Sequence, residues 1–421
     1  MLQDQEEREE IIARVAALDI GQKELVCCVR VPGKGRARAM EVTRHSTMTR
    51  SLQGLGDYLV GLGVTRVVME ATGVYWKAPF YVLEDAGLEV WLVNAKDVKH
   101  LPGRPKTDRL DAVWLCKVAE RQMLRPSFVP PLQIRQLRDL TRYRVALVEE
   151  CTREKQRVGK MLEDAQIKVD VVASDIFGVS GRAIMAALIA GQRDPKALAQ
   201  LALGRMRAKI PDLEEAFTGR FTDHHAFLLA RMLGRVDALE ADIAAVDAQI
   251  EELIAPFADD VGRLDTIPGI GRDLAVAIIA EIGLDMSRFP TTGHLASWAK
   301  FAPGVKASAG RNLGNGATGH GNRYLGRALG QAAVGTRRGD TFLGARYRRL
   351  ARRRGKKKAV VAVGRSILVI VWHLLSTPGE VYTDLGAKHY EEHANTARKR
   401  RNHIRQLEAL GYTVTLEPTA A

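Results

Sequence analysis

The chain has few cysteines, few aromatic residues and no long apolar run. Four cysteines occur in 421 residues, and aromatic residues make up 6%. The cysteines show no CxxC spacing, so the sequence gives no support for a disulfide framework or a zinc site. No apolar run reaches the roughly eighteen residues that a membrane-spanning helix needs. We therefore expect a cytoplasmic protein without a membrane anchor, with its cysteines as buried thiols.

Acidic residues are outnumbered by basic ones. There are 63 Lys and Arg against 49 Asp and Glu, which gives a formal net charge of +14. Such a surplus indicates a polyanionic partner, because Lys and Arg release condensed counterions from a nucleic-acid backbone. A solvated basic surface without a partner is the alternative. The length suffices for two or three domains.

The first quarter of the chain alternates between short apolar runs and helical patterns. We expect strands at 14–21, 24–31, 36–43, 66–70 and 88–93, with helices at 49–62, 75–86 and from about 106. Three strands followed by alternating helix and strand predict a mixed α/β sheet covered by helices. This is the layout of an RNase H-like domain, which we assign to residues 1–128.

Long helical patterns fill 134–167 and 225–257. The second carries a heptad seam typical of a coiled coil, made of Leu229, Met232, Val236, Leu239, Ile243, Val246, Ile250 and Leu253. The first has a seam interrupted by Arg144 and Glu154, so its pairing with the second stays open. We expect region 129–260 to mediate self-association, and residues 170–222 carry no recognisable role.

The last third begins with a glycine-rich turn at 266–271, which predicts a helix-hairpin-helix-like element able to hold a phosphate. A loop with six glycines is expected at 303–322, in a mainly α domain spanning 261–378. Basic residues crowd 346–358 and again 398–401, and residues 379–421 are expected to form a basic tail.

Four acidic residues form a candidate metal site. Asp19 and Glu70 each end an apolar strand, and Asp108 and Asp111 stand three apart at a helix start. Carboxylate oxygens suit Mg²⁺ or Mn²⁺, and paired ions of this kind serve phosphodiester chemistry. Capping and solvation are the alternative roles. Asp19 follows an apolar strand, where a lone charge is costly, and this favours metal binding.

Several runs resemble the transposases of insertion-sequence family 110, relatives of the Piv-type invertases. The runs Ala17–Gly21, Met69–Gly73 and Lys106–Ala112 are similar to the family's DEDD signature. Its second signature is matched by Ile267–Gly271, Phe301–Gly304, Ser308–Gly310 and Gly321–Arg323. The resemblance covers both ends of the chain and implies a RuvC-like N-terminal domain and a C-terminal transposase domain.

The resemblance also implies a composite reaction. Metal-bound carboxylates would work with a serine nucleophile, whose matching position is Ser308, through a covalent phosphoserine intermediate on DNA. Ser297 is the nearest rival and is expected to be structural. Ala309 interrupts the family's common Ser-Gly spacing. Members of the family use a structured bridge RNA to choose donor and target DNA, so a guide RNA is an expected partner.

Basic residues around Ser308 are candidates for phosphate contacts. We expect nucleic-acid binding by Arg311, His320, Asn322, Arg323, Arg327, Arg352, Arg353 and Lys356. The dense 346–358 cluster is expected to contact the backbone and not to read bases. Strand exchange needs at least two active sites, so we expect a homodimer that assembles into a tetramer on DNA.

Two other functions stay open. A junction-resolving nuclease would use the same carboxylates with activated water and would not need Ser308. A non-catalytic nucleic-acid-binding scaffold would need neither, since its acidic residues would only cap and solvate.

Overall fold

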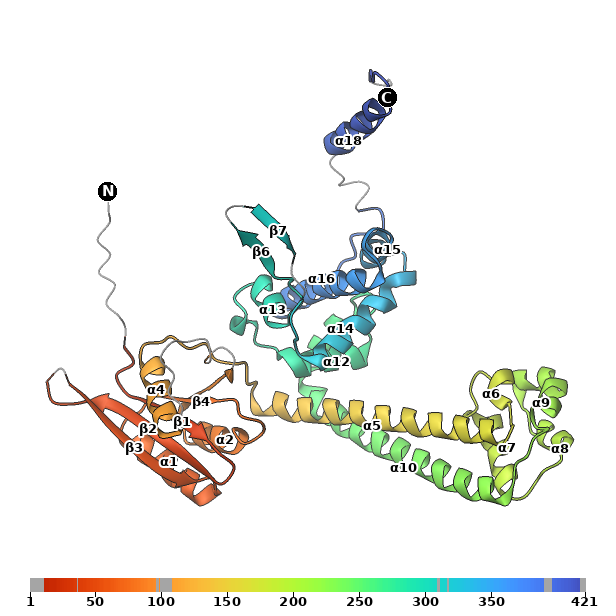
Figure 1. The fold of residues 1–421 in the computed structure, drawn as a ribbon, viewed down its shortest axis with the longest axis horizontal. Helices are drawn as coiled ribbons and strands as arrows, with labels where there is room; N and C mark the ends of the chain where they lie inside the picture. The colour runs from red at the N-terminus through yellow and green to blue at the C-terminus, as the bar shows by residue number, and fades with distance from the viewer. Residues whose placement is uncertain are drawn as a thin grey trace. The chain divides into compact units, whose positions relative to one another are not determined.

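The computed structural model describes residues 11–35, 37–95, 98, 108–308, 311–315, 318–389 and 396–416. They form two compact units, residues 1–129 and 130–421, shown as a ribbon in Figure 1. We call them unit 1 and unit 2.

Unit 1 is built on a five-stranded mixed sheet. The strands are β1 (Val15–Ile20), β2 (Glu24–Pro32), β3 (Arg38–Ser46), β4 (Arg66–Glu70) and β5 (Glu89–Val93), in the spatial order β3-β2-β1-β4-β5. β2 runs antiparallel to β1 and β3, whereas β4 is parallel to β1 and β5. The predicted mixed sheet is confirmed.

Helices cover both faces of this sheet. Helices α1 (Thr49–Gly61) and α2 (Lys77–Asp85) pack on one face, where Leu55 and Leu83 belong to the same buried cluster as Leu18 of β1. Helix α4 (Asp108–Glu120) packs on the other, with Cys116 beside Ala17. Because successive strand side chains point to opposite faces, the two clusters take alternate residues of β1. All four cysteines of the chain are free and buried, as predicted.

Two long antiparallel helices dominate unit 2. Helix α5 (Leu132–Asp164) lies beside α10 (Asp223–Ile254) in Figure 1. Lys155 binds Glu240 at 2.6 Å, while Arg144, nearer the start of α5, binds Asp247, further along α10. The pairing that the sequence left open is therefore present. Much of the heptad seam packs on α5 of the same chain.

Buried apolar side chains join the two helices. Leu147 and Cys151 of α5 form a cluster with Val236 and Leu239 of α10, and Ile243 packs against it. Part of the seam that was predicted for self-association is thus covered within one chain. A charge at Leu239 would disturb this intramolecular packing whatever the oligomeric state.

Residues between the two long helices form a small helical cap. Its elements are α6 (Val169–Val172), α7 (Val179–Ile189), α8 (Pro195–Ala199), the 3-10 helix η1 (Gly204–Lys209) and α9 (Ile210–Ala216). Their apolar side chains share one core with the ends of α5 and α10, including Leu162, Leu213 and Leu229. The cap closes the end of the helix pair.

The rest of unit 2 is mainly helical. Its helices are α11 (Ala258–Asp265), α12 (Arg272–Ile282), α13 (Thr292–Trp298), α14 (Arg323–Gly335), α15 (Phe342–Arg354), α16 (Lys356–Ser376) and α18 (Thr396–Ala409), with 3-10 turns at Ala255–Phe257, Met286–Arg288 and Thr336–Arg338. A two-stranded sheet pairs β6 (Val305–Ser308) with β7 (Arg311–Asn315). Helix α16 is long and apolar enough to cross a membrane by length and composition, so the expectation that no such run exists was wrong.

Helix α16 is a core element of unit 2. Its buried side chains include Val363, Ile367, Leu368 and Val371, and it packs against α13, α14 and α15. A core helix and a membrane-spanning helix have similar amino-acid compositions, because both bury apolar side chains.

The glycine-rich turn between α11 and α12 packs against α14. Gly269 has φ +87°, and an added Cβ would lie 2.3 Å from the carbonyl oxygen of Ala332. Ile267 and Ile270 on either side are buried. The predicted glycine-rich turn between two helices is present, and close packing against α14 accounts for its Gly269.

A buried glutamate joins three helices of unit 2. Glu281, in the last turn of α12, is 2% exposed. Arg142 of α5 donates to both of its carboxylate oxygens at 2.8 Å. Arg138 donates to the Glu281 carbonyl oxygen at 2.9 Å, and the Asn322 amide donates to the carboxylate from the start of α14. Because a buried charge is stable only when paired, this carboxylate fixes α5 to α12 and α14.

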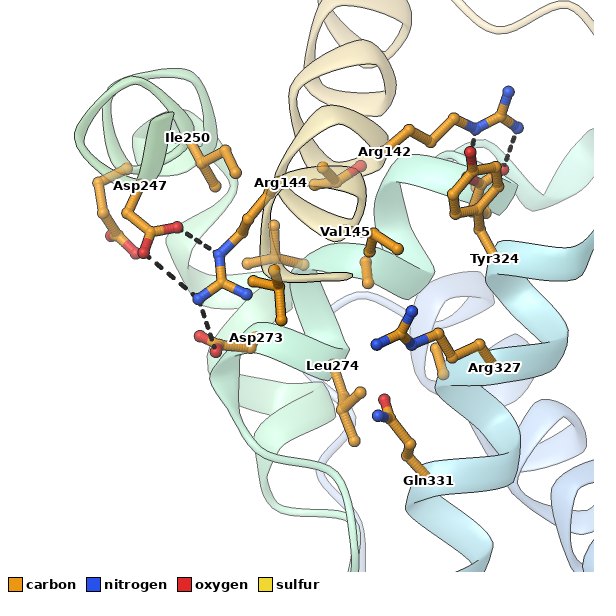
Figure 2. Close-up of a pocket in the computed structure, with 17 residues that line it drawn as sticks. Arg142, Arg144, Val145, Asp247, Ile250, Asp273, Leu274, Tyr324, Arg327 and Gln331 are labelled. Atoms are coloured by element: carbon orange, nitrogen blue, oxygen red, sulfur yellow. Dashed lines mark hydrogen bonds and ion pairs between the residues drawn. The ribbon is translucent and has the colours of Figure 1, made fainter. Parts of the chain in front are cut away.

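A pocket of about 560 Å³ lies where α5, α10, α12 and α14 meet. Figure 2 shows Arg144 of α5 between Asp247 of α10 and Asp273 of α12. Arg144 Nη2 lies 3.6 Å from Asp273 Oδ2. The hydrogen bond with Asp247 raises the pKa of Arg144 above its ordinary value, against the opposing effect of burial. Several charges at the rim of the pocket are therefore engaged with one another.

We expect Glu281→Leu to destabilise the protein by about 3–5 kcal/mol, because the arginines would lose their buried counter-charge. Glu251→Leu is the control: Glu251 binds Arg272 on the surface, where the two side chains are 55% and 46% exposed. It should cost less than about 1 kcal/mol. Chemical denaturation followed by circular dichroism measures both. Equal losses would contradict the role assigned to Glu281.

Candidate active site and nucleic-acid interface

Asp19 and Glu70 lie at the ends of adjacent parallel strands. Leu18 of β1 pairs with Met69 of β4, so Asp19 and Glu70 are the next residues in register. Both side chains are half-buried. Ala17 and Val68, two residues earlier on each strand, belong to the cluster under α4. The two-residue period of a strand therefore places Asp19 and Glu70 on the α4 face.

Helix α4 brings a third carboxylate to this face. Ala112 and Leu115 of α4 are buried in the cluster that also holds Ala17 and Val68. Asp111 precedes Ala112 and is half-buried. Asp108 is the first residue of α4, and its side chain lies outside the described residues. The helix therefore presents its first turn to the sheet face that carries Asp19 and Glu70.

This donor set has the chemistry that a hard divalent ion prefers, since carboxylate oxygens bind Mg²⁺ and Mn²⁺. Among the side chains that the structure describes, no three His, Cys, Asp or Glu residues form a group able to hold a metal. Asp108 is not among these side chains. Three of the four predicted residues thus share one sheet face without by themselves forming a complete metal site.

Ser308 lies at the end of a β-hairpin in unit 2. It is the last residue of β6 and pairs with Arg311, the first residue of β7, with a register shift between Val305 and Ala307. The expectation of a loop through 303–322 was wrong here, because cross-strand pairing orders part of the glycine-rich segment. The side chains of Ser308 and Arg311 lie outside the described residues. Ser297, the rival serine, lies in α13.

The base of this hairpin is anchored on α16. Phe301, which leads into β6, lies so close to Gly364 that an added Cβ there would stand 2.7 Å from its ring. Phe301 also donates its backbone N–H to the Ala296 carbonyl of α13 at 2.9 Å. The chain entering β6 is therefore held by two helices.

The predicted phosphate-binding residues after the hairpin divide into two groups. His320 and Arg323 are exposed, and Arg323 donates to the Tyr324 hydroxyl at 2.6 Å. Asn322 caps α14, since its side-chain oxygen accepts the Tyr324 N–H at 2.9 Å, while Arg327 pairs with Glu149 of α5. Asn322 and Arg327 thus already bind other parts of unit 2.

The predicted backbone-contacting residues lie at the junction of α15 and α16. Arg352 and Arg353 end α15, Lys356 begins α16, and all three are exposed. Gly355 joins the helices with φ +84°. Like charges of this density repel one another, and a polyanion would relieve that repulsion.

One residue beside the hairpin was not predicted. Lys300, just after α13, has the left-handed φ of +60°. A lysine at a helix end ordinarily suggests only a favourable interaction with the helix dipole, so the sequence carried no signal of this conformation.

Comparison with known proteins gives two family matches and one relative. Residues 16–167 match a family model described as a transposase, DEDD_Tnp_IS110, and residues 261–348 match a model of the transposase IS116/IS110/IS902 family. The chain is also 24% identical over 339 residues to the insertion element IS110 uncharacterized 43.6 kDa protein of Streptomyces coelicolor. That alignment covers 74% of this chain and 82% of the relative. The first match includes Asp19, Glu70, Asp108 and Asp111, and the second includes Ser308.

Proposed function

Since the chain belongs to the IS110 family of transposases, enzymes that transpose DNA, we propose that it cuts and rejoins DNA with two sets of residues. Carboxylates of unit 1 assist the reaction, and Ser308 of unit 2 forms a covalent link to the strand. The observation that carries the proposal is the position of Asp19 beside Glu70, on the sheet face that α4 covers.

The strand order of unit 1 supports an RNase H-like, RuvC-like catalytic domain. Its central strand β1 lies between an antiparallel and a parallel neighbour, and acidic residues follow the apolar parts of β1 and β4. Asp19, Glu70, Asp108 and Asp111 are the proposed ligands of Mg²⁺ or Mn²⁺. When bound, such ions neutralise the negative charge that develops on phosphate oxygens during transfer. The carboxylates would hold these ions, and partial burial limits how far the Asp19 and Glu70 side chains can move.

Ser308 is the proposed nucleophile. Its hydroxyl loses its proton as the oxygen attacks phosphorus, the bond from phosphorus to a sugar oxygen breaks, and the released sugar oxygen takes up a proton to become a hydroxyl. The product is a phosphodiester between Ser308 and DNA. Because that link retains the bond energy, a second sugar hydroxyl can displace the serine and rejoin strands without ATP.

The composite reaction requires Ser308 to approach the carboxylates, either within one protomer or from another protomer. Strand exchange needs at least two such sites, so a homodimer that becomes a tetramer on donor and target DNA is part of the proposal. The partly exposed seam residues Ile243 and Val246 are where a coiled-coil contact with a second copy would be sought.

Target choice is assigned to a structured guide RNA. The exposed basic residues Arg352, Arg353 and Lys356 support binding of a nucleic-acid backbone, which carries no base sequence information. Base pairing by an RNA held through its shape and phosphates would supply that information.

We expect Ser308→Ala to abolish the covalent protein–DNA adduct while DNA binding stays within about twofold, because only the attacking oxygen is removed. Ser297→Ala, on α13, is the matched control and should retain the adduct. Denaturing gels with end-labelled DNA measure the adduct. Cleavage that continues unchanged in Ser308→Ala would favour a metal-dependent nuclease that activates water.

We expect Asp19→Asn to lower metal-stimulated cleavage by about 100-fold or more, because a central charged ligand is lost. Asp57→Asn is the control, since Asp57 is an exposed carboxylate of α1 on the opposite face of the sheet. Calorimetric titration with Mg²⁺ and Mn²⁺ should show weaker binding for Asp19→Asn only. Unchanged metal affinity and activity would indicate a scaffold whose acids have no catalytic role.

A further inference from the structure

Lys300 holds a backbone conformation that glycine usually supplies. The non-glycine residues described with positive φ are Lys300 at +60°, Gln166 at +59° and Gln122 at +54°. Lys300 donates its N–H to the Ser297 carbonyl at 3.1 Å, and Phe301 donates to the Ala296 carbonyl at 2.9 Å. This hydrogen-bond pair is the Schellman ending of a helix, whose left-handed residue is most often Gly. A side chain at this position therefore adds strain.

A pocket of about 300 Å³ opens beside Lys300. Its wall includes Lys300, Phe301, Thr318, His320, Asn322 and Arg323. None of the described residues that line it is acidic, and two of its cationic residues, Lys300 and Arg323, are exposed. The pocket is therefore electropositive and suited to an anion.

The stem of Lys300 fits against two glycines. An added Cβ at Gly319 would lie 3.3 Å from Lys300 Cδ, and one at Gly321 would lie 3.0 Å from Lys300 Cβ and 2.6 Å from the Ala299 carbonyl oxygen. Any larger residue at Gly321 would displace this backbone. The two glycines therefore leave the space that the Lys300 stem occupies beside the pocket.

The pocket lies at the open end of the hairpin that carries Ser308. Phe301 precedes β6 and Thr318 follows β7, so both chain segments that line the pocket continue into the hairpin. At the rise of an extended strand, the four residues of β6 span about 13 Å. A DNA strand reaching Ser308 would therefore have neighbouring phosphates within reach of the pocket.

We propose that Lys300 and this pocket bind a backbone phosphate of the DNA strand on which Ser308 acts. The inference rests on the proposed function for the identity of that strand. Lys300 is a positioning residue: its ammonium group is a compact charge suited to phosphate, and His320 and Arg323 add donors beside it. The left-handed backbone of Lys300 places this residue in the wall of the pocket at the expense of local stability.

The Lys300→Gly substitution separates an effect on DNA binding from an effect on stability. It removes the positive charge, which should weaken binding, and it relieves the backbone strain, which should not weaken stability. We expect DNA affinity to fall about fivefold at about 150 mM salt, with the salt slope reduced by about 1. The melting temperature should stay the same or rise by about 2 °C. Binding of labelled duplex DNA to the full chain, measured without divalent ions so that no strand is cut, gives the affinity.

Gln166→Gly is the matched control. Gln166 closes the same hydrogen-bonded ending after α5, with its N–H on the Glu163 carbonyl and the Ile167 N–H on the Leu162 carbonyl. This variant should change the melting temperature in the same way and leave DNA affinity unchanged. Lys300→Arg should retain most of the affinity, because it keeps the positive charge.

The inference would be overturned if the Lys300→Gly variant bound DNA with the same affinity and the same salt slope as the unsubstituted protein. An equal loss in Gln166→Gly, or a loss confined to RNA with DNA binding intact, would also overturn it. Inorganic phosphate at millimolar concentration should compete with DNA less well in the Lys300→Gly variant than in the unsubstituted protein. Equal competition in the two proteins would show that the pocket is not a phosphate site. A reduced affinity in Lys300→Gly together with no covalent adduct in the unsubstituted protein would support the pocket and refute the serine reaction.

Discussion

The parallel pairing of β1 with β4 determines the geometry of the candidate metal site in unit 1. It sets Asp19 beside Glu70, and the alternation of strand side chains turns both toward α4. A shift of one residue would send either carboxylate to the face covered by α1 and α2. Such a shift is opposed because it would bury a charged carboxylate under α1 and α2 in place of an apolar side chain.

Unit 2 holds a β-hairpin on a helical base. Glu281 ties α5, α12 and the start of α14 together through buried hydrogen bonds. Phe301 against Gly364 fixes the chain that enters β6. The basic residues that remain exposed, His320, Arg323 and Lys300, gather at the foot of this hairpin. Stability and the proposed DNA contact are thus assigned to neighbouring but different side chains.

The sequence predicted elements well where periodicity is strong. The strands and helices of unit 1 and both long helices occur where expected, since apolar spacing reports burial directly. It could not show that the seam of α10 packs largely on α5, because a heptad pattern does not name its partner. The sequence also could not show that His320 is exposed while Asn322 and Arg327 are engaged. The partners of these two residues, Glu281 and Glu149, lie far away in the chain. The burial of Glu281 with a partner could have been predicted, because a lone charge in an apolar helix requires one.

In the proposed reaction, Ser308 of unit 2 links covalently to DNA with the help of the carboxylates of unit 1. Mass spectrometry of the protein–DNA adduct after protease and nuclease digestion tests it most directly. We expect a single modified peptide, with the nucleotide attached to Ser308, and no adduct when divalent ions are removed. Attachment to another residue, or cleaved ends that carry oxygen from labelled water with no modified peptide, would contradict it.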